Sequence, residues 1–380
     1  MFVLLYGGFG VSSPFLPRFF ESRGIVPAEL GLLLGLGTAV RLLSGPLAGR
    51  LADVYAARRA VLASCIAAAA CVALCLGRAT GFAALLALSL AHATVLAPTT
   101  TLADALALSA AAPRGAPRPA FEYGWVRGAA SAAFVVGSLV AGRVLEWAPM
   151  VAMVWMHAAL LGAAAVVVWL ALPAETPPPP ATSVEVRPLD GVRELLAIRA
   201  FRRLLVVAAL VLGSHAMHDG FAMLRWNAAG IGPATGSVLW SESVLAEVLM
   251  FFALGPALLR RMAARDAMAL AAVAGVVRWT VMASTASIVA IALVQPLHGV
   301  TFALLHLACM RAIIAAVPPA LSATAQSLYA AGATAVSAVL SIASGRLYAD
   351  LGAQGFLAMA LLCAIALPIT RGIAEPAAAP

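Results

Sequence analysis

The chain has 380 residues, of which 63% are hydrophobic and 11% are charged, and its formal net charge is +8. A soluble domain carries about 25% charged residues, so this composition excludes a water-soluble globular protein. The basic residues are all arginines and fall mainly in alternate loops between apolar runs, so the positive charge does not indicate nucleic-acid binding.

Apolar runs recur along the whole chain, and each helical span of a membrane needs about 20 apolar residues. We expect twelve spans, near residues 2–22, 28–52, 57–77, 81–109, 120–146, 148–172, 202–224, 235–259, 266–286, 288–314, 320–347 and 352–373. The first run lacks a basic n-region and a clear cleavage site, so it is interpreted as span 1 and not as a removed signal peptide. The five cysteines lie in predicted spans without paired metal-type spacing, and we expect free thiols.

One long polar stretch, residues 173–201, separates the first six spans from the last six. It contains four consecutive prolines, which end a helix and form a semi-rigid linker. The predicted domains are a six-helix bundle over 1–172, the linker 173–201 and a six-helix bundle over 202–380. Because arginine is enriched in the linker and in alternate loops, the positive-inside rule predicts that the linker and both termini are cytoplasmic.

Residues 24–92 reappear, weakly but without gaps, 206 positions later. Gly24-Ile25-Val26-Pro27-Ala28 returns as Gly230-Ile231-Gly232-Pro233-Ala234, and His92 returns as His298. Arg41 falls opposite Glu247. A duplicated half inside a hydrophobic chain is typical of a transporter whose site lies where the repeats meet.

Ionisable residues inside the spans are the main candidates for function, because a charge at membrane depth is costly. Arg41 lies near the middle of span 2 and Glu247 near the middle of span 8. They could pair with each other, or Glu247 could pair with Arg278 of span 9. We expect Arg41 to bind substrate, Glu247 to carry a proton, and Arg278 to have a structural role.

Histidine suits proton coupling or substrate binding, because it titrates near neutral pH. His92 and His298 lie near the middle of spans 4 and 10, whereas His215, His218 and Asp219 share one face of span 7. We expect His92, His215 and His298 to contact substrate, and His218 and Asp219 to take part in proton coupling. His157 is interpreted as structural. His306 and Met310 have a spacing that could bind a soft metal, but no further Met or Cys follows at helical spacing, so no metal is expected.

Aromatic residues could form walls for a flat ligand. The candidates are Tyr6, Phe9, Trp240, Phe302 and Tyr329. Asp104 and Arg127, near the ends of spans 4 and 5, are expected to form an ion pair in a gate region.

Two groups of residues resemble a known family. Gly49-Arg50-Leu51-Ala52-Asp53 followed by Arg58-Arg59 resembles the loop 2–3 signature of the major facilitator superfamily, with Val54 and Ala56 in place of its basic residue and glycine. In that signature Asp53, Arg58 and Arg59 would form a charged latch. The stretches Glu122-Tyr123-Gly124-Trp125-Val126-Arg127 and Leu297-His298-Gly299-Val300-Thr301-Phe302 resemble the 3-phenylpropionate-transporter-like branch, to which nucleoside and lactose proton symporters are more distantly related. His218-Asp219 departs from that pattern.

The resemblance implies an all-α membrane protein of the major facilitator fold, with twelve helices in two pseudo-symmetric bundles and alternating access. The expected function is proton-coupled symport of a small organic acid of aromatic type, by a monomer in a bacterial-type inner membrane. A sugar or nucleoside symporter, drug-type efflux and a non-transporting receptor are the alternatives within the fold. A membrane-embedded enzyme is disfavoured because neither H-E-x-x-H nor G-x-S-x-G occurs. A nucleotide-binding loop is also absent, so no cofactor other than the proton gradient is expected.

Overall fold

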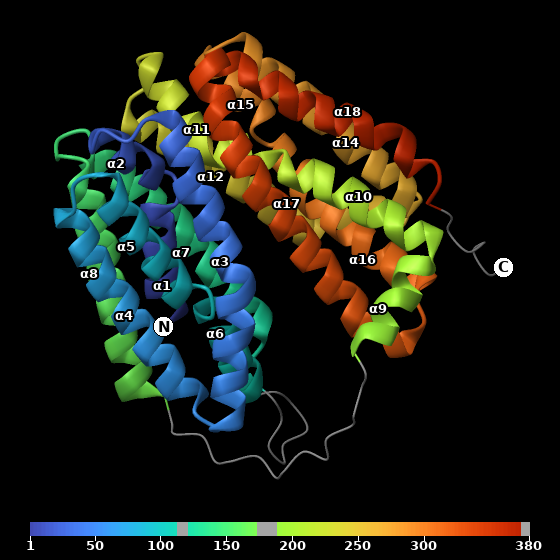
Figure 1. Cartoon of the computed structure of the whole chain (residues 1–380), viewed down its shortest axis with the longest axis horizontal. Coiled ribbons are helices and arrows are strands. Elements are labelled where there is room, and N and C mark those ends of the chain that lie inside the picture. The colour runs from blue at the N-terminus through green and yellow to red at the C-terminus, as the bar shows by residue number, and fades with distance from the viewer. Residues whose placement is uncertain (112–120, 173–187, 374–380) are drawn as a thin grey trace. The chain divides into compact units, whose positions relative to one another are not determined.

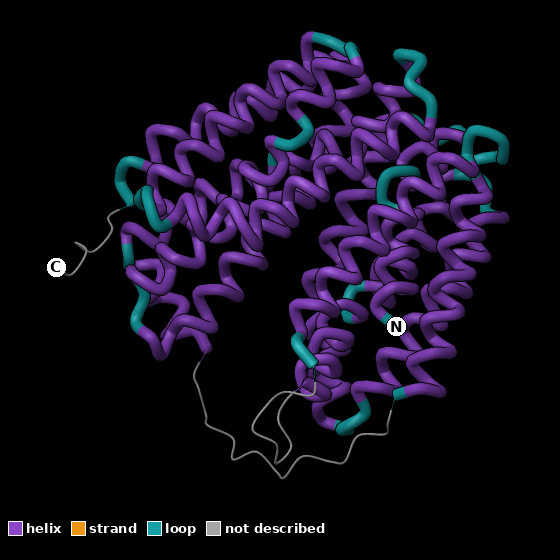
Figure 2. Tube along the Cα trace, turned by 180° about the vertical axis from the view of Figure 1, so that it is seen from behind, coloured by secondary structure: helices purple, strands orange, loops and turns teal. Residues whose placement is uncertain are grey.

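The computed structural model describes residues 1–111, 121–172 and 188–373. Helices make up almost all of these residues, and no strand occurs among them (Figure 2). The chain forms two compact units, one from Met1–Thr182 with Gly232–Val238 and the other from Ser183–Ile231 with Leu239–Pro380. Most of the predicted linker, residues 173–187, lies outside the described residues, and the linker and domain boundaries stay predictions.

The first unit is a bundle in which α1 packs on α7, and α4 lies beside α8 (Figure 1). Its helices are α1 (Phe2–Ser12), α2 (Leu16–Ser22), α3 (Pro27–Val54), α4 (Arg58–Arg78), α5 (Phe82–Leu96), α6 (Thr99–Ala111), α7 (Tyr123–Val144) and α8 (Val151–Ala171).

The second unit is a bundle in which α14 packs on α18, and α10 packs on α17 (Figure 1). Its helices are α9 (Pro188–Ala197), α10 (Arg199–Gly213), α11 (His215–Ala228), α12 (Pro233–Leu249, whose first turns group with the first unit), η1 (Met250–Leu254), α13 (Gly255–Leu259), α14 (Ala264–Ser284), α15 (Ile288–Val294), η2 (Gly299–Leu304), α16 (Leu305–Ala316), η3 (Pro319–Leu321), α17 (Ser322–Leu351), η4 (Gly352–Gly355) and α18 (Phe356–Thr370).

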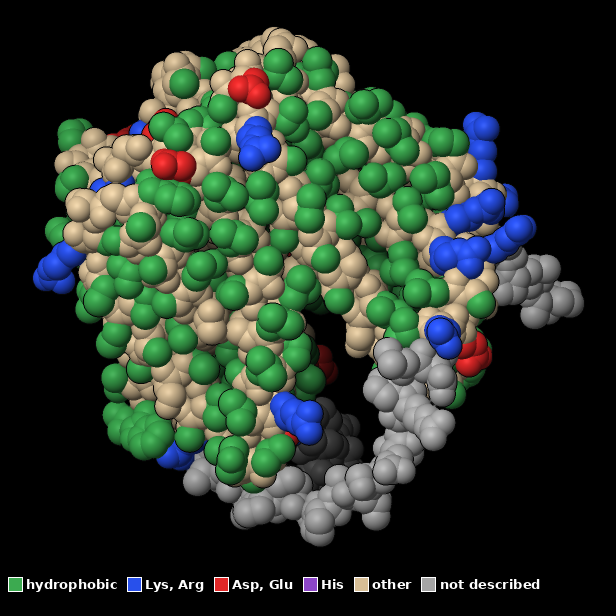
Figure 3. Space-filling model, viewed as in Figure 1, with side chains coloured by type: hydrophobic (Ala, Val, Ile, Leu, Met, Phe, Trp, Pro, Cys, Tyr) green, Lys and Arg blue, Asp and Glu red, His purple; other side chains and the backbone are tan. Residues whose placement is uncertain are grey.

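The described helices confirm the twelve predicted spans. Ten apolar segments are long enough to cross a membrane, and the last of them, Pro319–Thr370, contains both α17 and α18. Helices α1 and α2 together supply span 1, which bends at residues 13–15 beside Pro14. Apolar side chains are spread over the face shown in Figure 3, where charged side chains are few, as expected of helices that face lipid.

The repeat is visible in the local structure of one turn. Gly24 and Gly230 both have a left-handed backbone, with φ of 81° and 83°. Each follows a helix whose end is closed by the same bond, from Ile25 N–H to the Phe20 carbonyl and from Ile231 N–H to the Trp226 carbonyl. Glycine adopts this conformation without a steric penalty, which explains why it occurs at both positions.

Glycines allow α1 and α7 to cross closely. A Cβ atom at Gly10 would collide with the carbonyl oxygen of Phe134, and a Cβ atom at Gly137 would collide with that of Gly7. Small residues at such crossings let helices approach in a membrane, where lipid tails are as apolar as leucine side chains. The glycines of span 1 therefore form a packing surface for α7.

Spans 8 and 10 are irregular next to two of the predicted site residues. Two π-helical segments interrupt them, η1 shortly after Glu247 and η2 directly after His298. Pro296 leaves span 10 without one backbone donor just before this point. Such π segments are frequent at functional sites because they turn side chains away from the regular helical register.

The loop between α3 and α4 contains the resemblance to the loop 2–3 signature. Arg58 Nη2 lies 2.7 Å from Asp53 Oδ1, so these two residues form an ion pair. Arg59 takes a different role from the predicted latch. It donates to the Leu172 carbonyl at 2.7 Å, beyond the end of α8, and stacks over the ring of Trp169.

Ala56 in this loop has a φ of 46°, which is a left-handed conformation that disfavours any side chain. We expect Ala56→Gly to raise the free energy of unfolding by about 0.5–1 kcal/mol, because relief of the clash exceeds the entropic cost of glycine. Thermal unfolding in detergent measures this change. The matched control, Ala57→Gly, changes a residue with a φ of −126° and should lower the melting temperature. A lower melting temperature for Ala56→Gly would contradict the prediction.

Candidate functional site

Arg278 is the centre of a polar cluster inside the second unit. Its side chain on α14 is fully buried and stacks over the ring of Trp279 at 4.5 Å. One terminal nitrogen, Nη1, lies 3.2 Å from Nδ1 of His298. The other, Nη2, donates to Oε1 of Gln295 at 3.1 Å and lies 3.4 Å from Nε2 of His218. A guanidinium group only donates hydrogen bonds, so both histidine nitrogens that face it must accept.

His298 connects Arg278 to Glu247. Since its Nδ1 accepts from Arg278, its Nε2 carries the proton and donates to Oε2 of Glu247 at 3.2 Å. The imidazole is therefore neutral and bridges a cation and a carboxylate. Both side chains are half-buried, with 17% of His298 and 27% of Glu247 exposed.

His218 forms a second bridge, which connects Arg278 to Asp219. Its Nε2 faces two donors, Arg278 at 3.4 Å and the amide nitrogen of Gln295 at 3.3 Å. The proton must therefore reside on Nδ1, which lies 3.4 Å from Oδ1 of Asp219. His218 is 3% exposed, whereas the Asp219 side chain is 63% exposed. A carboxylate at this depth of a span faces water and not lipid, because lipid cannot solvate its charge.

Three further polar groups hold the cluster in place. Gln295 is fully buried and donates to the Leu239 carbonyl at 3.1 Å, so its oxygen is left for Arg278. His215 Nδ1 lies 3.1 Å from the Val211 carbonyl, and its Nε2 lies 3.0 Å from the hydroxyl of Thr301. Span 7 changes from α10 to α11 at Ser214, directly before these residues.

Aromatic rings enclose the histidines of the cluster. Trp240 stacks on His218 with ring centroids 4.9 Å apart, and Phe302 stacks on His298 at 5.5 Å. The ring of His215 meets that of Trp279 edge-on at 5.3 Å. Two of the predicted aromatic walls, Trp240 and Phe302, therefore pack on predicted polar residues.

The first unit contains a smaller polar group around His92. Its Nε2 lies 3.2 Å from Nε2 of His157, whose Nδ1 lies 2.8 Å from the Gly8 carbonyl. His157 is thus the partner of a candidate residue, which extends the structural role expected for it. Arg41, near the middle of α3, is exposed and lies near enough to His92 for an electrostatic interaction.

The remaining candidates lie in two smaller clusters. Arg127 forms an ion pair with Asp104 at 3.5 Å and hydrogen bonds to the hydroxyl of Tyr6, whose ring lies edge-on to Phe9. In the second unit, Tyr329 hydrogen bonds to Nδ1 of His306 at 3.1 Å. The ion pair occurs as predicted, whereas its role in gating stays a prediction.

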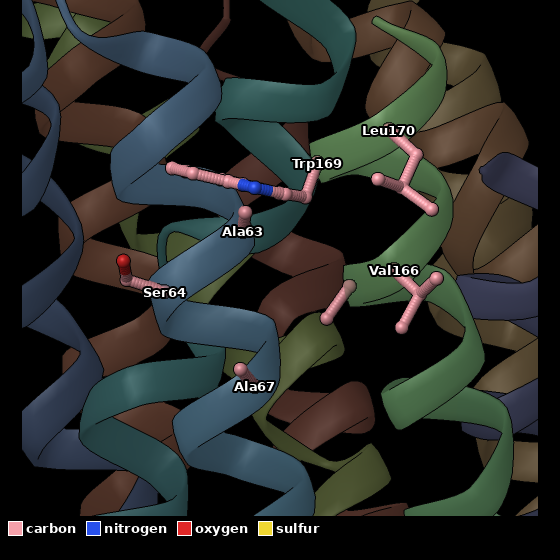
Figure 4. A pocket seen from close by; sticks show the side chains of 7 residues that line it. Ala63, Ser64, Ala67, Val166, Trp169 and Leu170 are labelled. Carbon is pink, nitrogen blue, oxygen red and sulfur yellow. The ribbon is translucent and has the colours of Figure 1, made fainter.

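A groove on the first unit is unsuited to a polar ligand. It has a volume of about 450 Å³ and lies between α4 and α8 (Figure 4). Its lining residues are Ala63, Ser64, Ala67, Ala165, Val166, Trp169 and Leu170. None of these residues is ionisable, so the polar clusters are the better candidates for the site.

Sequence reasoning identified most of this cluster but missed its connections. Gln295 was not singled out, although a glutamine beside a proline in an apolar span is an unusual pair. The expected partner of Glu247 was Arg41 or Arg278. In the second unit, His298 lies between Glu247 and Arg278 and is hydrogen bonded to both.

Comparison with known proteins identifies the class. Residues 1–358 match the MFS_1-like family. The chain is 32% identical over 367 residues to the probable 3-phenylpropionic acid transporter of Escherichia coli (strain K12), covering 95% of this chain and 92% of that protein. The chain therefore belongs to the MFS_1-like family and is a major facilitator transporter, not an enzyme.

Solved structures agree on the fold. A mutant of the nucleoside transporter NupG aligns with a TM-score of 0.84 at 16% identity, over 98% of this chain and 96% of that one. A bacterial homologue of the human lysosomal transporter Spinster aligns with a TM-score of 0.71 at 16% identity, over 97% and 94%. At this level of identity the likeness concerns the fold alone.

Proposed function

We propose that this transporter is a monomeric proton symporter of a small organic acid, with the linker and both termini in the cytoplasm of a bacterial-type cell. The observation that carries the proposal is the bridge from Glu247 through His298 to Arg278. A carboxylate at membrane depth that is partly exposed can exchange a proton with water on either side of an alternating-access cycle. The proposal also agrees with the name of the 32% identical relative, a probable 3-phenylpropionic acid transporter.

Glu247 is the proposed proton carrier. When ionised, it accepts a hydrogen bond from His298 and lies at the end of a bridge to the Arg278 charge. Protonation removes that charge and weakens the bond, because hydrogen bonds to ionised acceptors are roughly twice as strong as neutral ones. Glu247 therefore has two states whose contacts differ, which is the condition for coupling a proton to a conformational change.

Arg41 is the proposed binding residue for the substrate carboxylate. Its guanidinium is exposed near the middle of α3, and within the described part of the first unit no acidic side chain forms an ion pair with it. A planar guanidinium binds a carboxylate through two parallel hydrogen bonds, which favours an organic acid as ligand. His92 and the aromatic residues Tyr6 and Phe9 are proposed further contacts of the first unit.

Substitutions at Arg41 test this assignment. We expect Arg41→Lys to bind 3-phenylpropionate more weakly than the parent by about tenfold and Arg41→Gln hardly at all, because lysine keeps the charge but loses the planar fork. Without ligand, both variants should have the melting temperature of the parent, so that the loss concerns binding alone. Thermal-shift titration with 3-phenylpropionate and its amide measures both quantities.

A suitable control is Arg78→Gln, which removes an arginine from the end of α4. Equal binding of the acid and its amide by the parent would contradict an anion site and favour a neutral substrate such as a nucleoside. A lowered melting temperature of Arg41→Gln that is restored in Arg41→Gln/Glu247→Gln would show instead that Arg41 pairs with Glu247, and the organic-acid assignment would be withdrawn.

A further inference from the structure

The groove between α4 and α8 of the first unit is not used by the proposed transport mechanism. Its volume of about 450 Å³ lies within the range of roughly 300–1,000 Å³ that is typical of ligand sites. Alanines from both helices line it, and Figure 4 shows the Trp169 ring reaching from α8 across to α4 near Ala63. Val166, Trp169 and Leu170 are each more than half exposed. Such an apolar hollow on a membrane protein suits a hydrocarbon chain, because an unfilled hollow forfeits dispersion contacts.

A positive charge lies at one end of this groove. On α4, Arg59 precedes Ala63 and Ala67 at intervals of four residues, so the three side chains share one face of the helix. The guanidinium of Arg59 lies over the Trp169 ring, 5.2 Å from the ring centroid. Arg59 is therefore adjacent to the groove, at the end where α4 begins and α8 finishes.

Arg59 has hydrogen-bond donors that the described residues do not use. Its Nη1 donates to the Leu172 carbonyl, and its side chain makes no further hydrogen bond to residues 1–111, 121–172 or 188–373. Over the same ranges no acidic side chain forms an ion pair with it, and Asp53 of the neighbouring loop is paired with Arg58 instead. A guanidinium has several N–H donors and always carries its charge, so Arg59 can bind an anion.

We propose that this groove is a binding site for an anionic phospholipid, with an acyl chain between α4 and α8 and the phosphate group on Arg59. Arginine binds phosphate oxygens through paired N–H donors, and the cation favours a headgroup with a net negative charge over a zwitterionic one. The loop between α3 and α4 is predicted to be cytoplasmic, the side on which anionic lipids attract basic residues. The site is separate from the polar clusters, so this inference does not depend on the proposed function.

Fluorescence quenching by lipids brominated in their acyl chains tests the site, since bromine quenches the tryptophan rings that it contacts. The protein is reconstituted in phosphatidylcholine with increasing mole fractions of brominated phosphatidylglycerol or of brominated phosphatidylcholine. The difference between the parent and Trp169→Phe gives the signal of Trp169. Trp155→Phe is the matched control, because Trp155 also lies on α8 and is 53% exposed, but it lies beside Gly77 near the opposite end of α4.

We expect half-maximal quenching of Trp169 at a mole fraction about fivefold lower for brominated phosphatidylglycerol than for brominated phosphatidylcholine, the effect of one arginine at an anionic surface. Trp155 should respond equally to both lipids. Arg59→Gln should remove the preference of Trp169, whereas Arg78→Gln, at the other end of α4, should retain it. Ala67→Phe should also remove the preference, because it fills the groove from an exposed position and leaves Arg59 unchanged.

Equal quenching of Trp169 by the two lipids in the parent would show contact with bulk lipid only and would overturn the proposal. A preference that persists in Arg59→Gln would exclude Arg59 as the phosphate ligand, and one that persists in Ala67→Phe would exclude the groove as the place of the acyl chain. Protection of Trp169 from both lipids would show that protein covers this face, and the proposal would be wrong as well.

Discussion

Arg278→Leu is expected to lower the free energy of unfolding by about 3–5 kcal/mol, since it removes a fully buried cation and leaves the polar side chains that face it without their donor. The change would remove the donors to His298, His218 and Gln295, and with them the bridges through the two histidines to Glu247 and Asp219. Such a loss is a large fraction of the roughly 5–15 kcal/mol by which proteins are stable, so we expect poor expression and no transport.

The control for Arg278→Leu is Arg225→Leu. Arg225 is also a buried arginine of the second unit, but it donates to the Thr285 carbonyl and lies over the ring of Phe356. Its loss should cost about 1.5–3 kcal/mol, the range for a hydrogen bond to a charged group. Arg278→Lys, which keeps the charge but loses the planar fork, should lower the melting temperature less than Arg278→Leu does. A parent-like melting temperature for Arg278→Leu alone would contradict the role of Arg278 as the central donor of this cluster.

Glu247→Gln is expected to abolish accumulation of substrate against its gradient while leaving exchange intact. A neutral amide cannot take up or release a proton, yet it can accept the hydrogen bond from His298 through its oxygen. The measurement is uptake by proteoliposomes under an imposed pH gradient, with the ratio of inner to outer substrate as the readout.

Glu242→Gln is the matched control, because Glu242 lies on the same helix and is half-buried. This variant should accumulate substrate as the parent does. If Glu247→Gln also reaches the parental ratio, Glu247 is not the proton carrier. A loss in both variants would indicate damage to α12 in place of a specific effect.

The sequence was sufficient to predict the fold because each span is a local property. About 20 apolar residues in succession can satisfy their backbone hydrogen bonds only as a helix when they lie in lipid. The turn at Gly24 and its copy at Gly230 are local as well, since a glycine followed three residues later by a proline marks both in the sequence. The bends at Pro14 and Ser214 were missed, because apolar composition continues through them.

The partners of the polar residues could not be predicted in the same way. Helical spacing placed His215, His218 and Asp219 on one face of span 7, but it does not fix which neighbouring helix that face meets. His298 and His92 occupy equivalent positions of the repeat. His298 nevertheless bridges Arg278 and Glu247, whereas His92 contacts His157. The two copies have kept their histidine and changed its partners, so the repeat predicts position and not chemistry.

The most direct test of proton symport is the movement of protons when a substrate gradient alone is imposed. Addition of 3-phenylpropionate outside proteoliposomes, in weakly buffered medium without a pH gradient, should make the outer medium more alkaline as substrate and protons enter together. Empty liposomes correct for passive entry of the acid, and Glu247→Gln protein should add nothing to that background. Entry of 3-phenylpropionate through the parent protein without any protein-dependent change in external pH would contradict the account.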